Sequence, residues 1–379
     1  MSSPSVLIID DHVADERAKF VVLASTLKME FRHPQDVTSD DLEDADVVVV
    51  DFKLDDDWQQ RDELQEIALK PMNGLAVVSV LQSHERRLDG SPTAFVLRSA
   101  HLSDLSPEFA ADTRLHVIAR QNNLDWVLNK DAELATQTLQ IESLANATSE
   151  LPEAWPSDNS ERLMELVQGW LGLGQTNWRQ LAWQDVEDCH PPIHELAERK
   201  HGLRLVRWMT QRILPYPCFL WTTARLATRL RVTGESLQAA LLSGLAQFLE
   251  LAQYVGALKE FDGDVRWWRS GLESVLWELT EGRSFDTELT RELLNQRCQG
   301  QLVAGDIQQP VLCLDREFQI RAEPCDLADV VRVQPDDWPV YADQAWAAVS
   351  DALDEPRLAA ATISVDREKL TNRKTREDS

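Results

Sequence analysis

The chain contains few cysteines and no apolar run long enough to cross a membrane. Its 379 residues include five cysteines, which are Cys189, Cys218, Cys298, Cys313 and Cys325. An odd, widely spaced set does not fit a disulfide framework. No stretch approaches the ~20 apolar residues that a membrane-spanning helix requires. No secretory leader precedes the first predicted strand, so we expect a protein of the reducing cytoplasm.

Basic residues are also scarce relative to acidic ones. The sequence has 38 Lys+Arg against 64 Asp+Glu, a formal net charge of -26. This excess opposes general adhesion to nucleic acids or anionic membranes, so a dedicated DNA-binding protein is disfavoured, although a local basic patch remains open. The hydrophobic content of 43% is enough for the cores of two or three domains and excludes a wholly disordered chain.

Tryptophan is rare in the first part of the chain, where only Trp58 and Trp126 of the 13 tryptophans occur. The stretch 148–160 is rich in Pro, Ser and acidic residues and is typical of an exposed linker. We therefore predict a first domain at 1–147, a linker at 148–160 and a second, helical domain at 161–300. A hairpin and helix at 301–365 are expected to pack on the helical domain, and 366–379 to form a mobile tail.

The first domain alternates short apolar runs with amphipathic segments. The apolar runs predict strands at 5–9, 45–50, 93–97 and 126–128, and the amphipathic segments predict helices at 15–27, 75–81, 115–121 and 132–144. This alternation is typical of an α/β fold with a doubly wound parallel sheet covered by helices.

Polar residues follow the predicted strands. They are Asp10 and Asp11 after the first run, Asp51 after the second, Ser99 after the third and Lys130 after the fourth. Ligands of an open parallel sheet bind at the carboxyl ends of its strands. We therefore expect these five side chains to meet at one edge of the sheet.

Together with Pro71-Met-Asn-Gly74, this ordered set resembles the receiver domain of bacterial two-component response regulators, over roughly the first 146 residues. The resemblance implies a flavodoxin-like fold in which Asp51 accepts a phosphoryl group from a histidine kinase or a small phosphoryl donor. Lys130 would hold the phosphoryl oxygens, and Ser99 would bond to the phosphoryl group once it is present.

A carboxylate that attacks a phosphorylated donor needs a divalent cation to neutralise the phosphoryl oxygens. Mg²⁺ prefers oxygen ligands and keeps several waters. The expected ligands are the carboxylates of Asp10, Asp11 and Asp51 and the backbone carbonyl of Lys53.

Two segments depart from the receiver pattern. An acidic insertion, 55–70, separates Asp51 from Pro71, and a second insertion, 101–112, follows Ser99. The first would limit access of the donor, supply a further cation ligand or contact a partner, and a harmless surface insertion is the alternative. Both leave open whether phosphorylation is blocked or tuned.

The second half carries a predominantly helical pattern without a familiar motif. Helices are expected at 161–173, 192–213, 220–230, 234–258, 264–280, 287–298 and 341–353, with a hairpin formed by 310–314 and 318–321. We identify no helix-turn-helix, phosphate-binding loop or nucleophile elbow in it.

Three features of this half are candidates for function. The stretch 199–231 holds interleaved arginines and aromatics, so Arg204, Arg207, Arg225 and Arg229 either form an output surface for an acidic partner or nucleic acid, or lie on the wet faces of helices. Trp267 and Trp268 are adjacent, so we expect one of them at an interface. Cys189, His190 and His194 are metal-binding residue types, but their spacing matches no familiar zinc module.

The leading hypothesis is a response regulator whose receiver controls a helical output domain that acts by binding an unidentified downstream protein. Its only chemistry would be phosphoryl transfer to Asp51. One alternative is a receiver-like scaffold that is not phosphorylated. Another is an effector enzyme or nucleic-acid-binding output gated by the receiver. No membrane partner is expected.

Overall fold

The computed structural model describes residues 3–21, 26–54, 73–85, 91–105, 114–196, 202–298 and 301–371. These residues group into two compact units. Unit 1 takes its residues from 1–173, 191–215 and 255–263, and unit 2 takes its residues from 174–190, 216–254 and 264–379. Within the described ranges, no helix combines the length and the apolar composition needed to cross a membrane.

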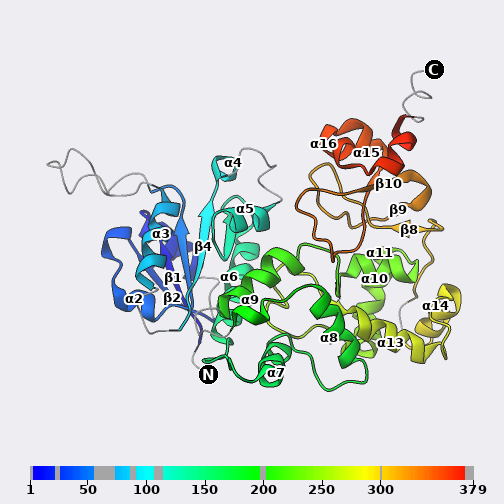
Figure 1. Cartoon of the computed structure of the whole chain (residues 1–379), viewed down its shortest axis with the longest axis horizontal. Helices are drawn as coiled ribbons and strands as arrows, with labels where there is room; N and C mark the ends of the chain where they lie inside the picture. Colours follow the sequence, from blue (N-terminus) through cyan, green and yellow to red (C-terminus); the bar gives the residue numbers. More distant parts are fainter. Residues whose placement is uncertain are drawn as a thin grey trace. The chain divides into compact units, whose positions relative to one another are not determined.

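Unit 1 is built on a five-stranded parallel sheet (Figure 1). Its strands are β1 (Ser5–Ile9), β2 (Lys28–Arg32), β3 (Val47–Asp51), β4 (Ala94–Ser99) and β5 (Trp126–Asn129), in the order β2-β1-β3-β4-β5. After β1 the chain forms β2 at one edge of the sheet. The next strand, β3, pairs with the other side of β1, and β4 and β5 follow it outward. This is the flavodoxin-like order, with its switch point between β1 and β3. The predicted parallel sheet is confirmed.

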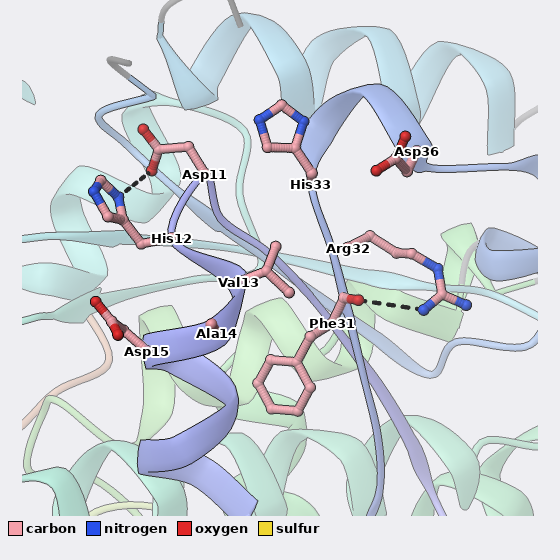
Figure 2. Close-up of a pocket in the computed structure, with 9 residues that line it drawn as sticks. All are labelled: Asp11, His12, Val13, Ala14, Asp15, Phe31, Arg32, His33 and Asp36. Carbon is pink, nitrogen blue, oxygen red and sulfur yellow. Dashed lines mark hydrogen bonds and ion pairs between the residues drawn. The ribbon is translucent and has the colours of Figure 1, made fainter. Parts of the chain in front are cut away.

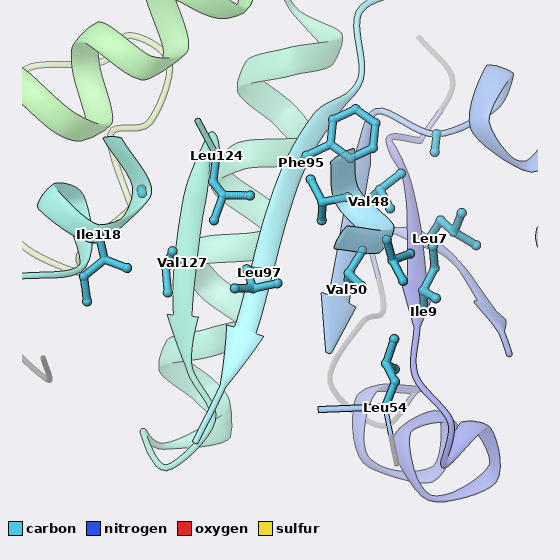
Figure 3. Close-up of a cluster of buried hydrophobic side chains, with 14 of the residues drawn as sticks. Leu7, Ile9, Val48, Val50, Leu54, Phe95, Leu97, Ile118, Leu124 and Val127 are labelled. Carbon is cyan, nitrogen blue, oxygen red and sulfur yellow. The ribbon is translucent and has the colours of Figure 1, made fainter. Parts of the chain in front are cut away.

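Helices cover both faces of the sheet. In chain order they are α1 (Val13–Val21), α2 (Ser39–Glu43), α3 (Gly74–Glu85), α4 (Leu102–Leu105), α5 (Leu115–Gln121) and α6 (Leu134–Ser149). Alternate side chains of a strand point to opposite faces. Leu7, Val48 and Leu97 lie on one face in a cluster that also contains Val77 of α3 and Ile118 of α5 (Figure 3). Helix α6 packs against β1, β3 and β4.

Edge strand β2 was not predicted. Its sequence is Lys28-Met-Glu-Phe-Arg32, in which only Phe31 is buried. An edge strand needs a single apolar contact with the core and carries charged side chains elsewhere, which also discourages pairing with other chains. The strand therefore lacks the continuous apolar run that marks β1 and β3.

Segments from beyond the sheet complete unit 1. They include α7 (Ser160–Trp170), the 3-10 turn Ile193–Glu195, α9 (Leu203–Trp208), which continues as a π-helical turn at Met209–Ile213, and the stretch 255–263. Arg207 Nε lies 2.7 Å from Asp125 Oδ1, and Gln211 Nε2 donates to the carbonyl of Leu124 at 2.8 Å. The ring of Phe261 packs edge-on against Trp126, with centroids 4.8 Å apart. These contacts cover the β5 edge.

The stretch 148–160, expected to be an exposed linker, contains three buried residues, Thr148, Leu151 and Trp155. Helix α6 runs into it as far as Ser149, and α7 is joined to α6 by a hydrogen bond from Trp170 Nε1 to the carbonyl of Ala147 (3.0 Å). Apolar contacts therefore continue through this region of unit 1. The division of the chain at 148–160 stays a prediction.

Unit 2 combines short helices with two-stranded sheets, and about half of the C-terminal part is helical. Its helices are α8 (Arg179–Asp188), α10 (Thr223–Leu230), α11 (Gly234–Ala240), α12 (Ala246–Phe248), α13 (Arg269–Leu279), α14 (Thr287–Asn295), α15 (Val349–Asp354) and α16 (Pro356–Ala361). The strands pair as β6 (Leu220–Trp221) with β7 (Trp267–Trp268), β8 (Pro310–Val311) with β9 (Cys325–Asp326), and β10 (Val330–Val333) with β11 (Ala345–Ala348).

Five of the expected helices are interrupted or shortened. In 220–230 and 264–280, the strands β6 and β7 precede the helices α10 and α13. The segment 192–213 contains a 3-10 turn, α9 and a π-helical turn instead of one helix in its described part. The segment 234–258 leaves helical geometry at Ser243 and at Gly244, which has a φ of 113°. In 341–353, residues 345–348 form strand β11 before α15 begins. At the site of the expected hairpin, Leu314 bridges Ile320 in an antiparallel pair.

Candidate functional site

Three charged side chains meet at the switch point of the sheet. Asp10 directly follows β1, Asp51 ends β3, and Lys130 directly follows β5. Asp10 and Asp51 are 2% and 6% exposed. The Lys130 Nζ atom lies 2.8 Å from Asp51 Oδ1 and 3.6 Å from Asp10 Oδ2. The structure therefore brings together three residues that are distant in sequence, as the parallel arrangement predicts.

The two aspartates carry more negative charge than Lys130 offsets. Burial raises the pKa of Asp10 to about 6, and the nearby charge of Asp51 contributes to the rise. Burial also raises the pKa of Asp51, although the hydrogen bond from Lys130 opposes this. Burial disfavours the charged form of Lys130, but the hydrogen bond and the charge of Asp51 outweigh it, so the Lys130 pKa is raised. A site of this kind gains stability from an added cation.

Asp11 extends the acidic group toward a cavity of about 470 Å³ (Figure 2). The Asp11 carboxylate accepts a hydrogen bond from His12 Nδ1 at 2.9 Å, which raises the pKa of His12. Arg32 and His33 stand on the opposite wall of the cavity. Asp10, Asp11 and His12 are the one group of three or more potential metal ligands found within 4.8 Å of one another among the described residues.

The donor set fits a hard divalent cation. Asp10 Oδ1 accepts the backbone N–H of His12 at 2.8 Å, whereas Asp10 Oδ2 is buried and makes no hydrogen bond. A buried carboxylate oxygen without a hydrogen-bond partner is costly unless a cation is coordinated there. Mg²⁺ takes carboxylate oxygens and keeps waters, and the rim beside Asp11 opens to the cavity. The backbone N–H of Lys53 donates to Asp51 Oδ2 at 3.3 Å, and ligation by the Lys53 carbonyl stays a prediction.

Ser99 ends strand β4 beside Asp51 and Lys130. Asp51 is in register with Arg98 in the β3–β4 pair, Ser99 is in register with Asn129, and the Lys130 N–H donates to the Ser99 carbonyl at 2.9 Å. The Ser99 side chain is buried, and its Oγ accepts the backbone N–H of His101 at 2.9 Å. The hydroxyl therefore stands at the same end of the sheet as the acidic group and can donate its proton.

Gly74 holds the backbone after Asp51 in place. The Gly74 N–H donates to the carbonyl of Phe52 at 2.8 Å. A Cβ atom at Gly74 would lie 2.1 Å from the backbone oxygen of Asp51, which no side chain tolerates. Glycine is therefore required for this close approach. Pro71 and Met72 of the predicted turn lie outside the described residues.

A buried polar network supports the Lys130 loop, and sequence reasoning missed it. Arg98 on β4 pairs with Glu16 of α1, with Nη1 and Oε2 2.6 Å apart, and both side chains are buried. Arg98 Nε donates to Gln137 Oε1 at 2.8 Å, and Gln137 Nε2 donates to the Lys130 carbonyl at 3.2 Å. The network thus ties the loop that carries Lys130 to β4 and α1. The available signal was an arginine inside an otherwise apolar strand.

The four arginines proposed as an output surface are all ion-paired. The pairs are Arg204 with Glu195 (2.6 Å), Arg207 with Asp125 (2.7 Å), Arg225 with Asp343 (2.8 Å) and Arg229 with Glu273 (2.7 Å). Because each guanidinium already contacts a carboxylate of its own unit, the helix-face interpretation describes these residues better than a surface that grips phosphates. Arg199 and Lys200 lie outside the described residues.

Trp267 and Trp268 are both buried, at 1% exposure each. The two residues form strand β7, so their side chains point to opposite sides. Trp267 belongs to the cluster around Leu272, and Trp268 stacks on Phe219 with centroids 5.5 Å apart. The expectation that one tryptophan lies at an interface assumed that only one side of this strand faces a core. Apolar side chains cover each side, so neither tryptophan offers an exposed side chain to a partner.

The Cys189, His190 and His194 set does not gather into a metal site among the described residues. The Cys189 thiol hydrogen-bonds to Cys218, and the ring of His190 packs edge-on against Tyr341. Most of the two predicted insertions, at 55–70 and from 106 onward, lies outside the described residues, so their effect on phosphorylation stays a prediction.

No family model matches this chain, and no curated protein matches it. Matches to solved structures include RcsB from Salmonella enterica serovar Typhimurium bound to promoter P1flhDC in the presence of a phosphomimetic. That match has 11% identity and a TM-score of 0.27, and it covers 54% of this chain and 92% of that one. Another is the response regulator ChrA of a heme-sensing two-component system, with 13% identity, a TM-score of 0.24 and coverage of 65% and 91%. Likenesses of this strength do not define a family, so functional assignment depends on the geometry of the site.

Proposed function

We propose that the chain is a phospho-accepting regulator in which Asp51 receives a phosphoryl group with the help of Mg²⁺. One observation carries the proposal. The buried Asp51 carboxylate is bonded to Lys130 at the switch point of the sheet, beside an Asp10 oxygen that has no hydrogen-bond partner. A buried carboxylate, a cationic group and a carboxylate oxygen without a hydrogen-bond partner therefore share one edge of the sheet.

The chemistry follows from the roles of these groups. An oxygen of Asp51 attacks the phosphorus of the donor, a new P–O bond forms, and the bond to the donor's leaving group breaks with its electron pair going to that group. When bound, Mg²⁺ neutralises the phosphoryl oxygens. Asp10 and Asp11 would hold the cation, and Lys130 would exchange its contact with the Asp51 carboxylate for one with a phosphoryl oxygen. The Ser99 hydroxyl donates a hydrogen bond to the product.

The acyl phosphate changes the charge at Asp51 and offers new acceptors to Lys130 and Ser99. These residues follow or end β5 and β4, and Ser99 and Lys130 are joined through their backbones. A shift at this edge would reach the loops after β4 and β5, where a protein partner reads it. We propose a histidine kinase or a small phosphoryl donor as the source and an unidentified protein as the target.

The test uses the full chain, acetyl phosphate and Mg²⁺, with intact-mass detection. The wild type should gain the mass of one phosphoryl group, and Asp51→Asn should gain none. Asp40→Asn, which removes an exposed carboxylate of α2, is the matched control and should gain as much as the wild type. An unmodified wild type, or equal labelling of Asp51→Asn, would contradict the proposal. Stabilisation by Mg²⁺ without any phosphoryl gain would instead favour the scaffold alternative.

A further inference from the structure

Unit 2 contains two pairs of cysteine thiols in contact. Cys189 interacts with Cys218 and Cys313 with Cys325, the Cys313 thiol also lies 3.9 Å from the carbonyl oxygen of Val311, and all five cysteines of the chain are unbridged. The first pair is buried on both sides. In the second pair Cys313 is fully buried, but Cys325 is partly exposed. The two pairs therefore differ in their access to solvent.

The pairing of neighbouring strands sets the Cys313–Cys325 contact. Cys325 lies in β9, in antiparallel register with Val311 of β8, two residues before Cys313. The Arg321 N–H donates to the Cys313 carbonyl at 2.8 Å, which fixes the returning chain. The Cys313 sulfur contacts both the thiol and the backbone N–H of Cys325. The two sulfur atoms are thus held together by main-chain structure.

The environment of Cys325 favours its thiolate. The hydrogen bond from the Cys313 thiol lowers the pKa of Cys325 to about 7, and the guanidinium of Arg321 contributes to the lowering. At neutral pH a larger fraction of such a thiol is therefore ionised than of an ordinary cysteine, whose pKa is about 8.5. By contrast, the pKa of Cys189 in the buried pair is raised by its hydrogen bond to Cys218 and by burial.

We propose that Cys313 and Cys325 form a hydroperoxide-responsive dithiol that closes to a reversible disulfide. The Cys325 thiolate attacks one oxygen of the hydroperoxide, the O–O bond breaks, and the other oxygen leaves as an alcohol or water after taking a proton. Cys325 becomes a sulfenic acid. The Cys313 sulfur then attacks the Cys325 sulfur, the S–O bond breaks, and water leaves with the Cys313 proton. The two thiols supply the two electrons that reduce the peroxide.

The disulfide would join two stretches that meet at a small core. Leu314, the residue after Cys313, packs in the cluster that contains Val331 and Ala347. Arg321 also forms an ion pair with the buried Asp351. When disulfide formation removes the Cys325 thiolate, Asp351 remains as a charged partner of Arg321. The reaction requires neither Asp51 nor a cation, so it stands apart from the proposed phosphorylation.

The experiment treats the reduced full chain with hydrogen peroxide, blocks remaining thiols with N-ethylmaleimide, and maps the peptides. The wild type should lose two hydrogens, take up two fewer maleimides, and yield a cross-link between the peptides of Cys313 and Cys325 that dithiothreitol reverses. Its formation rate should rise about tenfold from pH 6 to pH 8, the change in thiolate fraction for a pKa of about 7.

Three variants sharpen the test. Cys325→Ser should form no disulfide, and Cys313→Ser should accumulate a sulfenic acid at Cys325 that dimedone traps. Cys298→Ser, which removes a cysteine outside both pairs, should react as the wild type does. Asp51→Asn should also react normally, which separates this proposal from the phosphorylation proposal.

Three outcomes would overturn the dithiol proposal: a cross-link between Cys189 and Cys218 instead, no cross-link in the wild type, or dimedone labelling mainly at Cys298. The wild-type peptide map decides the matter even if a variant fails to fold.

Discussion

The two units use charged side chains in different ways. At the switch point of unit 1, Asp10 and Asp51 face a single lysine, and one buried carboxylate oxygen has no hydrogen-bond partner. In unit 2, a carboxylate such as Asp366 is matched by its own arginine, here Arg332, through a pair of hydrogen bonds at 3.0 and 2.8 Å. Unmatched buried charge is costly, so it persists where a ligand completes it, whereas matched charge serves the fold.

This contrast bears on the basic stretch at 199–231, whose role as an output surface stays a prediction. Arg225 and Arg229 looked available for an acidic ligand because the acidic residues that pair with them lie elsewhere in the sequence. Asp343 is 118 residues from Arg225, and Glu273 is 44 from Arg229. A cluster of like charges in sequence is therefore weak evidence for a binding surface unless the opposite charges of the fold are known.

The largest expected effect concerns the buried ion pair between Arg98 and Glu16 in unit 1. It tests whether this pair stabilises the fold. Arg98→Met breaks the buried pair with Glu16, and we expect a loss of about 3–5 kcal/mol in the free energy of unfolding. Phosphorylation should also slow because Gln137 no longer anchors the Lys130 loop through Arg98. Urea denaturation measures the first effect and intact-mass kinetics the second. The double variant Arg98→Met/Glu16→Gln should recover much of the stability, and a double variant as unstable as the single one would contradict this role.

The second prediction concerns the backbone beneath the acidic site. Gly74→Ala places a Cβ against the Asp51 backbone oxygen, so the main chain must move. We expect a loss of about 2–4 kcal/mol and a severe loss of phosphoryl acceptance. Gly169→Ala in α7 is the matched control, since nothing lies within 4 Å of its added Cβ, and it should gain about 0.5–1 kcal/mol. Equal behaviour of the two variants in thermal unfolding would remove the argument for a special close approach.

The third prediction is that removing a charge from the acidic site raises the free energy of unfolding instead of lowering it. Because the pKa of Asp10 is raised to about 6 in the folded state, its ionised form costs stability above that pH, and the cost disappears below about pH 4. Without a divalent cation, Asp10→Asn should therefore be more stable than the wild type by about 1–3 kcal/mol at pH 7. The difference should shrink as the pH falls through 6. Mg²⁺ should raise the melting temperature of the wild type but not of the variant, and an Asp10→Asn protein that is less stable at pH 7 would refute the assignment.

The smallest expected effect concerns Asp366 in unit 2, whose charge is paired with Arg332. The hydrogen bond to Arg332 lowers the pKa of Asp366, so this carboxylate contributes stability above pH 4 that is lost as the pH falls through its folded value. Asp366→Asn should lose about 1 kcal/mol at pH 7, since the pair is partly exposed. Denaturation at pH 7 and pH 3 should show a larger loss at pH 7 than at pH 3. Stabilisation by Asp366→Asn would erase the contrast between the units.

Sequence reasoning recovered the sheet because its central strands are continuous apolar runs. Those runs ended at Asp10, Asp51 and Ser99, so the register of parallel strands was enough to predict that the polar groups share an edge. The Arg98 network escaped notice because its partners, Glu16 and Gln137, come from two different helices. Only the folded arrangement shows that these three side chains meet.

Unit 2 was harder to predict because its elements are short and depend on tertiary contacts. The Ala345–Ala348 strand has a composition that favours helix, and pairing with β10 overrides that preference. The predicted helix at 234–258 has an apolar pattern on both sides of Ser243 and Gly244. This periodicity predicts one continuous helix, although the backbone leaves helical geometry at these two residues. Helix α8 was missed because its apolar residues, such as Trp183 and Val186, are few.

The return of residues 191–215 and 255–263 to unit 1 bears on how the protein is made. During synthesis the strands of the sheet emerge early, but the segment that carries Phe261 follows the end of α6 by more than a hundred residues. At typical translation speeds that gap corresponds to roughly ten seconds. The flank of Trp126 would stay uncovered on the ribosome for this period, so chaperones have an obvious place to act on the nascent polypeptide.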